Sequence, residues 1–551
     1  MIHGTPKLLV FFVFIFTLLI NLTSAGGHMD TWDGIETFLV TESMVLKHTA
    51  KLDPTVPSVD KLDFHVRYSV YSNMQIQAPP GKYYDQNTMP LEPVYTVRSL
   101  LLSALAVPLY YTALIFSISP IVTVSLFANP LFNALTCVII FCFAVEVYGS
   151  KKIAFILSLL FGVCSFAWSY QTSFWTQPLQ ALTLITSAFF IYKSLHYSPS
   201  FLCHYLISNK SNGIYFAGLG GLFLGLSVFA HPTSIILVPG FIIYSIYHLR
   251  KNPRILFSFL VTVTITLFFI GLVNYLRFGS FTEFGYGYFA SLQTHNGWRG
   301  LIGLLVSPGA GLFLYFPTSI LLPLAAIYMN KENRSLFLLF MYIIVATWLS
   351  AGTLSFDFEP FSWWGTGWGP RYLLCILPFI TIMLGSILSH IGKHTHMGKR
   401  IHIEKKTLPL TISFIALSVA GFCISLLGVL IWWQYDIVYV SEKEQLWNQD
   451  PWNLIVWNPS YSPIVLHTKM LMTDYLSHID PQKYVDTGWN WIAYGSTPCS
   501  YDLYIFCNFG IAPVLFSLAV IAILGYCIGI QTGMFKISSK RLVFRKLYKS
   551  S

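Results

Sequence analysis

The sequence predicts an all-α polytopic membrane protein, and three observations support this fold class. Hydrophobic residues make up 55% of the 551 residues and charged residues only 10%, a balance that excludes a disordered chain and differs from that of ordinary soluble domains. Long apolar runs recur along the chain. The charges between these runs are sorted by sign, which is the pattern that orients membrane proteins.

Lysine and arginine collect in one set of connecting segments, and acidic residues collect in the alternate set. The first set contains Glu332 and Glu404, with Glu146 just before one segment, while the other 20 acidic residues lie in the alternate loops. Basic loops stay in the cytoplasm, so both chain ends are expected inside. The net charge of +10 follows the span ends and forms no single patch, which argues against nucleic-acid binding. The basic segments hold 21 of the 33 Lys and Arg residues and are Lys7, 147–152, 193–213, 248–254, 330–334, 391–407 and the tail after 531.

A spanning helix needs about 20 predominantly apolar residues, and thirteen runs approach that length. They are 6–25, 99–118, 121–146, 153–169, 178–193, 214–230, 233–248, 255–275, 311–329, 335–352, 371–391, 408–433 and 509–531. With both ends inside, the number of crossings must be even, so we expect about 12 transmembrane helices.

The run at 99–118 is the one expected not to cross, because it carries Pro108 at its middle and follows a polar outside loop. A true span is the alternative for this run. The first run is expected to be an anchoring helix, with a cleaved signal peptide as the alternative, since small residues follow it at Ser24 and Ala25.

These runs divide the chain into five predicted parts. A first transmembrane helix at 1–25 precedes an outside loop at 26–120 that contains interfacial helices and the non-spanning run. A multi-span module at 121–433 follows, then an outside loop or cap at 434–508. The last helix and the basic cytoplasmic tail occupy 509–551.

Carboxylates crowd the start of the first outside loop, where Asp30, Asp33, Glu36 and Glu42 follow the first span. Asp33 and Glu36 are three residues apart and would share a face of a helix. A carboxylate held at the membrane surface can serve as a general base toward an incoming hydroxyl. The alternative is a solvated helix start, where acidic residues are also favoured.

The segment WWGTGWGPRY places Arg371 at an outer membrane boundary, directly before a span. A guanidinium in this place can bind a lipid phosphate through two hydrogen bonds, and Trp363, Trp364 and Trp368 would line a sugar or lipid groove. An interfacial aromatic belt with a snorkelling arginine is the alternative.

Two further positions are weaker candidates for the same site. Lys82, in the turn APPGKYYD, could meet a phosphate or could simply be exposed. His231 lies between two closely spaced spans and could be structural. The spacing of His, Cys and acidic residues predicts no metal site, although a divalent cation is compatible with the acidic loop. Cys499 and Cys507 lie in the last outside loop, where a disulfide can form.

Several stretches, taken in order, resemble the superfamily of polyprenyl-phosphate-dependent membrane glycosyltransferases with the GT-C fold, in particular its protein-mannosyltransferase-like and aminoarabinose-transferase-like branches. The likeness covers about residues 26–380 and leaves 434–508 unexplained. It is carried by DGIETFLVTE, the PPG turn, Pro108-Leu109-Tyr110, LGLSVFAHPTSIILVPG, LLVSPGAGLFLYFP and WWGTGWGPRYLLCILPF.

The resemblance implies a GT-C-like fold and an acidic catalytic base after the first span. Asp33 is the best match for this base, with Asp30 and Glu36 as rivals. Many relatives carry an Asp-Glu pair where this chain has Asp33-Gly34, and many carry arginine where this chain has His231. Arg371, with Lys82, would bind the donor phosphate.

The expected function is transfer of a sugar, with inversion, from a polyprenyl-phosphate donor to an acceptor at the outer face of the cell membrane. The acceptor could be a protein, a lipid or a glycan. A lipid-linked glycan flippase or transporter is one alternative, although the spans carry little charge at mid-membrane. A non-catalytic membrane subunit of a glycosylation complex is the other.

Overall fold

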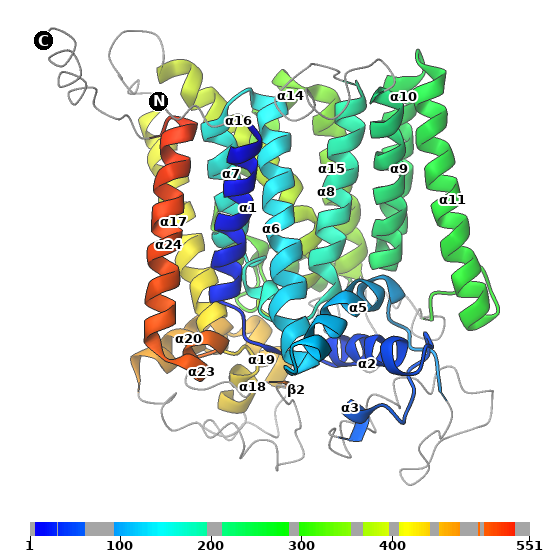
Figure 1. Ribbon diagram of the computed structural model, residues 1–551. Helices are drawn as coiled ribbons and strands as arrows, with labels where there is room; N and C mark the ends of the chain where they lie inside the picture. The colour runs from blue at the N-terminus through cyan, green and yellow to red at the C-terminus, as the bar shows by residue number, and fades with distance from the viewer. Residues whose placement is uncertain are drawn as a thin grey trace, which may run out of the picture.

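Long helices run side by side in a bundle, with shorter helices lying across one end of it (Figure 1). The computed structural model describes residues 6–29, 31–60, 93–195, 212–285, 297–353, 367–395, 407–440, 451–473, 494–495 and 501–534. The bundle helices are α1 (Pro6–Thr23), α6 (Pro120–Tyr148), α7 (Lys151–Val163), α8 (Thr176–Leu195), α9 (Asn212–Ala230), α10 (Val238–Leu249), α11 (Pro253–Phe278), α14 (Leu322–Glu332), α15 (Arg334–Thr353), α16 (Leu377–Thr395), α17 (Leu408–Leu430) and α24 (Ile511–Thr532).

Eight segments of the described chain are long and apolar enough to cross a membrane. The all-α polytopic membrane fold predicted from the sequence is confirmed, while the expected number of about 12 crossings stays a prediction. The eight segments are Pro120–Tyr148, Gly213–Ala230, Pro232–Leu249, Pro253–Phe278, Arg334–Thr353, Arg371–Lys393, Leu408–Leu430 and Ile511–Thr532.

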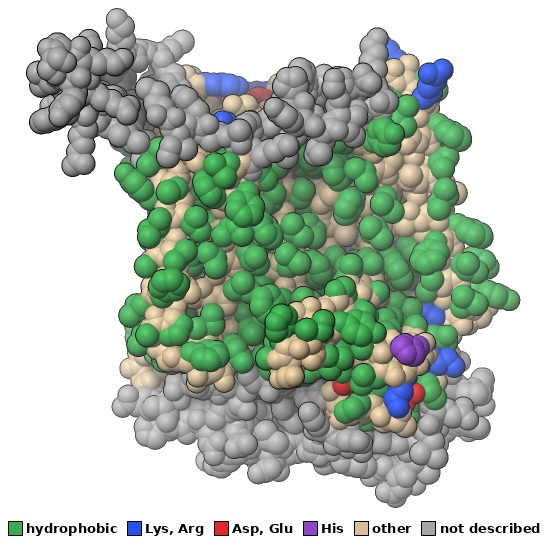
Figure 2. Space-filling view, in the orientation of Figure 1, with side chains coloured by type: hydrophobic (Ala, Val, Ile, Leu, Met, Phe, Trp, Pro, Cys, Tyr) green, Lys and Arg blue, Asp and Glu red, His purple; other side chains and the backbone are tan. Residues whose placement is uncertain are grey.

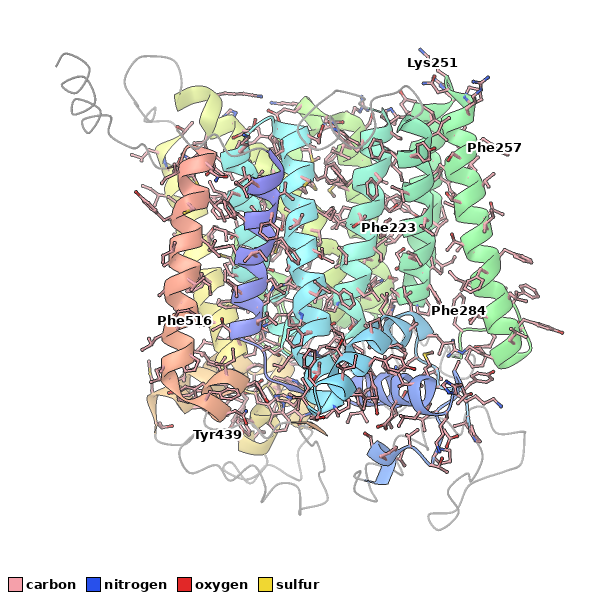
Figure 3. All side chains as sticks on the ribbon, in the orientation of Figure 1. Phe223, Lys251, Phe257, Phe284, Tyr439 and Phe516 are labelled. Atoms are coloured by element: carbon pink, nitrogen blue, oxygen red, sulfur yellow. The ribbon has the colours of Figure 1, made fainter. Side chains whose placement is uncertain are left out.

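On the face of the bundle shown in Figure 2, the surface is apolar over its middle, and charged side chains appear toward its ends. Phe257 and Phe516 extend outward from their helices (Figure 3) and are 69% and 72% exposed. Lys251 lies at the end of the bundle where α1 begins and α24 ends, and Tyr439 lies at the opposite end. Such a surface matches a hydrocarbon layer bounded by two polar interfaces.

Three bundle helices start with a 3₁₀ turn: η3 (Pro232–Leu237) leads into α10, η5 (Pro317–Leu321) into α14 and η6 (Arg371–Ile376) into α16. The sequence explains the change of geometry, because a proline stands at the second position of each α-helix: Pro239, Pro323 and Pro378. Proline has no N–H to donate and its fixed φ suits the first helical turn. The α-helix therefore begins at the residue before each proline, and the preceding turn keeps 3₁₀ geometry.

The segment between α1 and α6, predicted to be the first outside loop, folds against one end of the bundle. It contains α2 (Trp32–Leu46), α3 (Pro57–Asp60) and α5 (Leu100–Ile115), and α2 and α5 lie across the ends of the long helices (Figure 1). The hydroxyl of Ser103 donates to the carbonyl of Thr37 at 2.8 Å, and the hydroxyl of Thr41 donates to the carbonyl of Ser103 at 3.1 Å. These bonds join α5 to α2, and their apolar side chains form a second core beside the main one.

Later segments cover the same end. They include α12 (Gly297–Val306), α13 (Leu312–Tyr315), α18 (Tyr435–Val438), α19 (Pro451–Trp457), α20 (Pro463–Met472), α23 (Tyr504–Phe509) and the 3₁₀ turns η2 (Ser169–Gln171) and η8 (Pro459–Tyr461). The strand β1 (His28–Met29) pairs antiparallel with β2 (Tyr494–Gly495). Segments from both ends of the sequence thus meet beside α2.

Candidate functional site

The start of α2 places Asp33 at the edge of the bundle. Thr31 caps the helix, its side chain accepting the N–H of Gly34 at 3.3 Å. Gly34 leaves room for the backbone of a neighbouring segment, since a Cβ at this position would lie 2.8 Å from the carbonyl oxygen of Phe174. The cap and the glycine together fix the direction of the Asp33 side chain in the first turn.

Two arginines from distant parts of the chain hold the two oxygens of Asp33. Nη2 of Arg98 lies 2.6 Å from Oδ1, and Nη1 of Arg371 lies 3.4 Å from Oδ2. The side chains of Asp33 and Arg98 are 22% and 19% exposed, whereas Arg371 is almost fully buried. A carboxylate and two guanidiniums therefore form a partly accessible charged centre.

The Gly-Trp-Gly-Pro segment before η6 sets the position of Arg371. Gly367 and Gly369 have φ angles of 145° and 77°, which favour glycine over residues that carry a Cβ. The guanidinium of Arg371 lies over the ring of Trp175 at 4.8 Å and over the ring of Tyr372 at 5.2 Å. These contacts keep the planar group facing Asp33.

Arg98 is held from two sides. Its Nε donates to Oε2 of Glu36 at 3.0 Å, so Asp33 and Glu36, which share one face of α2, both contact one guanidinium. Arg277, at the end of α11, donates to the carbonyl oxygens of Thr96 and Arg98. The segment before α5 is thereby attached to the bundle, and Arg98 has a fixed direction.

The two glutamates of α2 have different surroundings. Glu42 is buried and accepts hydrogen bonds from the N–H and hydroxyl of Ser58 and from the hydroxyl of Tyr110. Glu36 is also buried, yet its Oε1 has no hydrogen-bond partner among the residues that the structure describes. Glu42 thus joins α2 to α3 and α5, whereas Glu36 belongs to the charged centre.

The charges of this centre shift the pKa values of its members in different directions. Burial by itself would raise the pKa of Asp33, but Arg98 and Arg371 outweigh that effect and hold the pKa below its ordinary value. Burial raises the pKa of Glu36 to about 7, with Arg98 opposing and Asp33 adding to the rise. At neutral pH, Asp33 is therefore a carboxylate and Glu36 is poised to exchange a proton.

His231 belongs to the same neighbourhood. Burial and the nearby positive charge of Arg371 lower its pKa to about 4, so the ring is neutral at physiological pH. Its Nδ1 lies 2.8 Å from the hydroxyl of Thr233. A neutral imidazole beside the arginines can take part in hydrogen bonding without adding another positive charge.

A small cavity lies beside the charged centre. Trp175 joins the two, because it lines the cavity and also carries the Arg371 guanidinium over its ring. Trp368 lines the cavity and is itself buried, stacked on His467 with ring centroids 4.5 Å apart. The other lining residues are Ser169, Tyr170, Thr172, Gly367, Gly428, Trp433 and Asp502.

The structure brings together five of the residues singled out in the sequence. Asp33, Glu36 and Arg371 belong to one charged centre, the neutral His231 lies beside it, and Trp368 lies three residues before Arg371. The other four candidates lie outside the described residues and remain predictions: Asp30, Lys82, Trp363 and Trp364.

Sequence reasoning missed Arg98 and the role of Trp175. A signal for Arg98 was present, because it is an arginine next to an apolar run on the acidic side of the chain, as Arg371 is. Trp175 could not be distinguished from the many other aromatic residues at span ends. Within the described part of the chain, no three His, Cys, Asp or Glu residues gather as a candidate metal site.

Comparisons with known proteins give structural similarity alone. No protein-family model matches the sequence, and no curated protein matches it. The apo crystal structure of the Archaeoglobus fulgidus oligosaccharyltransferase is similar over 82% of this chain and 60% of its own, with 12% identity and a TM-score of 0.43. The structure of the archaeal enzyme from the same organism with an inhibitory peptide and a dolichol-phosphate is similar over 78% of this chain and 60% of its own, with 12% identity and a TM-score of 0.38. This chain thus spans about 60% of the length of the oligosaccharyltransferases it resembles.

Proposed function

We propose that this multi-pass membrane protein is a glycosyltransferase that moves a sugar from a polyprenyl-phosphate carrier to an acceptor at the membrane face where α2 lies. The observation that supports the proposal is the meeting of Asp33, Arg98 and Arg371 at one end of the bundle. A carboxylate and two guanidiniums are the groups that such a transfer needs, one to accept a proton and two to bind a phosphate. The order of GT-C-like motifs in the sequence points to the same reaction.

In the proposed reaction, the acceptor oxygen attacks the anomeric carbon while Asp33 takes its proton. A new bond forms between the acceptor oxygen and the anomeric carbon, and the bond from that carbon to the phosphate oxygen breaks. The leaving polyprenyl phosphate keeps the electron pair, and Arg371 stabilises its developing negative charge, an electrostatic effect that is often large in enzymes. Attack opposite the leaving group inverts the anomeric centre.

The membrane supplies the rest of the arrangement. A polyprenyl chain would lie along the apolar outer surface of the bundle, which places its phosphate at the level of the helix ends. Confining the donor to this layer raises its local concentration at Asp33 and fixes its orientation, and such positioning accounts for a large part of many rate enhancements. By the sorting of charges, this face is the outer one, with both chain termini on the cytoplasmic side.

The proposal is tested by transfer of a labelled sugar from polyprenyl-phosphate donors by the purified chain, with and without a chelator. The acceptor panel includes lipids, glycans and a peptide with the Asn-Val-Thr sequon, the acceptor tethered in a third A. fulgidus oligosaccharyltransferase structure. We expect wild type to be active and Asp33→Asn to lose at least about a thousandfold in turnover, at the upper part of the range for general-base catalysis.

A matched control is Asp53→Asn in the same loop, because the carboxylate of Asp53 accepts the N–H and the hydroxyl of Thr55 in a local turn. Its activity should equal that of wild type. Activity retained in Asp33→Asn would move the base to Glu36 or Asp30. Inactivity of folded wild-type protein across the whole panel would favour transport or a non-catalytic subunit.

A further inference from the structure

We infer that Arg98 and Arg371 form a phosphate-binding site that the Asp33 carboxylate fills in the free protein, and that the donor phosphate displaces Asp33 and thereby releases it to act as the base. The inference rests on the proposed function and deepens it in two ways. It assigns Arg98 to the phosphate site, and it makes the availability of the base depend on the donor.

The geometry of the ion pairs supports an exchange of one anion for another. Each oxygen of Asp33 faces a different guanidinium, at 2.6 Å for Arg98 and 3.4 Å for Arg371. A phosphodiester also presents two oxygens that share one negative charge, and guanidiniums bind carboxylates and phosphates through the same forked donors. The phosphate can therefore take the contacts that Asp33 makes, without a new set of donors.

The two arginines are held in place independently of Asp33. Arg98 is fixed by Glu36, and its backbone carbonyl accepts from Arg277. Arg371 lies over the ring of Trp175, and its buried Nε has no hydrogen-bond partner among the described residues. The guanidiniums would stay in position when Asp33 turns away, and Arg371 has donor capacity left for a further acceptor.

The exchange solves a chemical difficulty of the free state. A carboxylate held by two guanidiniums is a poor proton acceptor, because protonation would forfeit both ion pairs. Once a phosphate binds both arginines, Asp33 loses its cations and stands beside a negative charge, which raises its affinity for a proton. The base thus gains strength only when the donor is present.

The test is a double-mutant cycle on binding, which requires no turnover. Farnesyl phosphate is titrated into the purified full-length chain at constant ionic strength, using wild type, Asp33→Asn, Arg98→Gln and the double variant. We expect Asp33→Asn to bind about tenfold more tightly than wild type, equivalent to about 1.4 kcal/mol. In the Arg98→Gln background this gain should fall to about threefold or less, because the contact that Asp33 competes for has been removed.

If the loss of any nearby negative charge were enough to tighten phosphate binding, Glu36→Gln would tighten it as much as Asp33→Asn does. Glu36→Gln removes a neighbouring carboxylate that contacts Arg98 through Nε and does not contact Arg371, so it should tighten binding by less than Asp33→Asn. An equal gain from Asp33→Asn in both backgrounds, or no gain in either, would overturn the exchange. If Arg98→Gln does not give monodisperse protein, Arg98→Lys serves in its place, since lysine keeps the charge and lacks the fork.

A second probe separates two sources of phosphate. Phosphatidic acid carries the same headgroup on a different tail. If Asp33→Asn binds farnesyl phosphate more tightly than wild type does, but not phosphatidic acid, the site is specific for the isoprenoid carrier. If the variant binds both more tightly, the site recognises the phosphate whatever the tail. Each result supports the exchange. If the protein transfers sugar but the effect of Asp33→Asn does not depend on Arg98, the exchange is wrong and the proposed function stands. If the effect depends on Arg98 but no sugar is transferred, phosphate binding by the two arginines stands and the proposed transfer reaction is wrong.

Discussion

Removal of the His467 ring should both destabilise the protein and weaken donor binding. The ring is fully buried, stacks on Trp368 and faces Asp436, whose Oδ1 lies 3.3 Å from Nε2. An aromatic pair contributes about 0.5–1.5 kcal/mol beyond its buried area. Truncation of a large buried ring to alanine leaves a cavity and costs about 3–5 kcal/mol. His467→Ala should therefore lower the free energy of unfolding by about 4 kcal/mol or more.

The same change should reach the proposed phosphate site through Trp368, which lies three residues before Arg371. The assay combines thermal unfolding in detergent with the Kd for farnesyl phosphate. The control is Met472→Ala, at an 82% exposed position on the same helix, which should change neither quantity. Addition of Asp436→Asn to His467→Ala should recover part of the lost stability, because burial disfavours the ionised form of the Asp436 carboxyl group and the amide carries no charge. If nothing is recovered, and donor affinity is unchanged, the coupling that we describe does not exist.

An independent substitution acts on the same indole from the other side. A Cβ at Gly428 would lie 2.4 Å from the ring of Trp368, a distance that forces the ring to move. Gly428→Ala should weaken donor binding without removing any polar group. Gly392→Ala is its control, because a Cβ there meets nothing within 4 Å. Equal donor affinity in both variants would show that the position of Trp368 does not matter for binding.

Three further predictions concern α2 and its partners. The pKa of Glu36 in the folded protein, about 7, lies above its value of 4.5 in an unfolded chain. The folded state therefore binds the proton more tightly, and the free energy of unfolding should fall as the pH rises from about 4.5 to 7. Glu36→Gln should flatten this part of the pH profile of unfolding. Tyr110→Phe leaves the buried Glu42 with one donor fewer and should cost about 1.5–3 kcal/mol of stability, whereas Tyr111→Phe, at an exposed position, should be neutral. Arg371→Lys should raise the donor KM by about tenfold, since lysine supplies a point charge without the planar fork; an unchanged KM would remove Arg371 from the donor site.

The polytopic helical fold was predictable because its determinant is local. An apolar run of sufficient length becomes a helix in a bilayer, where each backbone N–H and C=O must be satisfied within the segment. The 3₁₀ turns at η3, η5 and η6 were not predicted, since hydropathy does not distinguish a 3₁₀ turn from an α-helix. Their signal was present in Pro239, Pro323 and Pro378, each of which restarts a helix.

The charged centre was only partly predictable because it depends on tertiary contacts. Asp33 and Glu36 are close in sequence, and their shared helix face follows from their spacing. Arg98 lies 62 residues after Glu36, and no spacing rule relates the two. The structure also shows that Cys507 is disulfide-bonded, and its pairing with Cys499 stays a prediction.

The contact between His28 and Asp502 has a consequence for how the protein is made. Their side chains lie 2.6 Å apart across 474 residues of sequence, and the N–H of Tyr504 donates to the carbonyl of Ala25. A ribosome adds residues at about 5–20 per second, so residues 25–28 would wait roughly half a minute or longer for these partners. During that interval the segment that leads to Asp33 lacks its packing partners Asp502 and Tyr504. The helices up to α17 would thus be synthesised before His28 and Asp502 can pair, so the strand that leads to α2 would take its final position only after most of the bundle has been made.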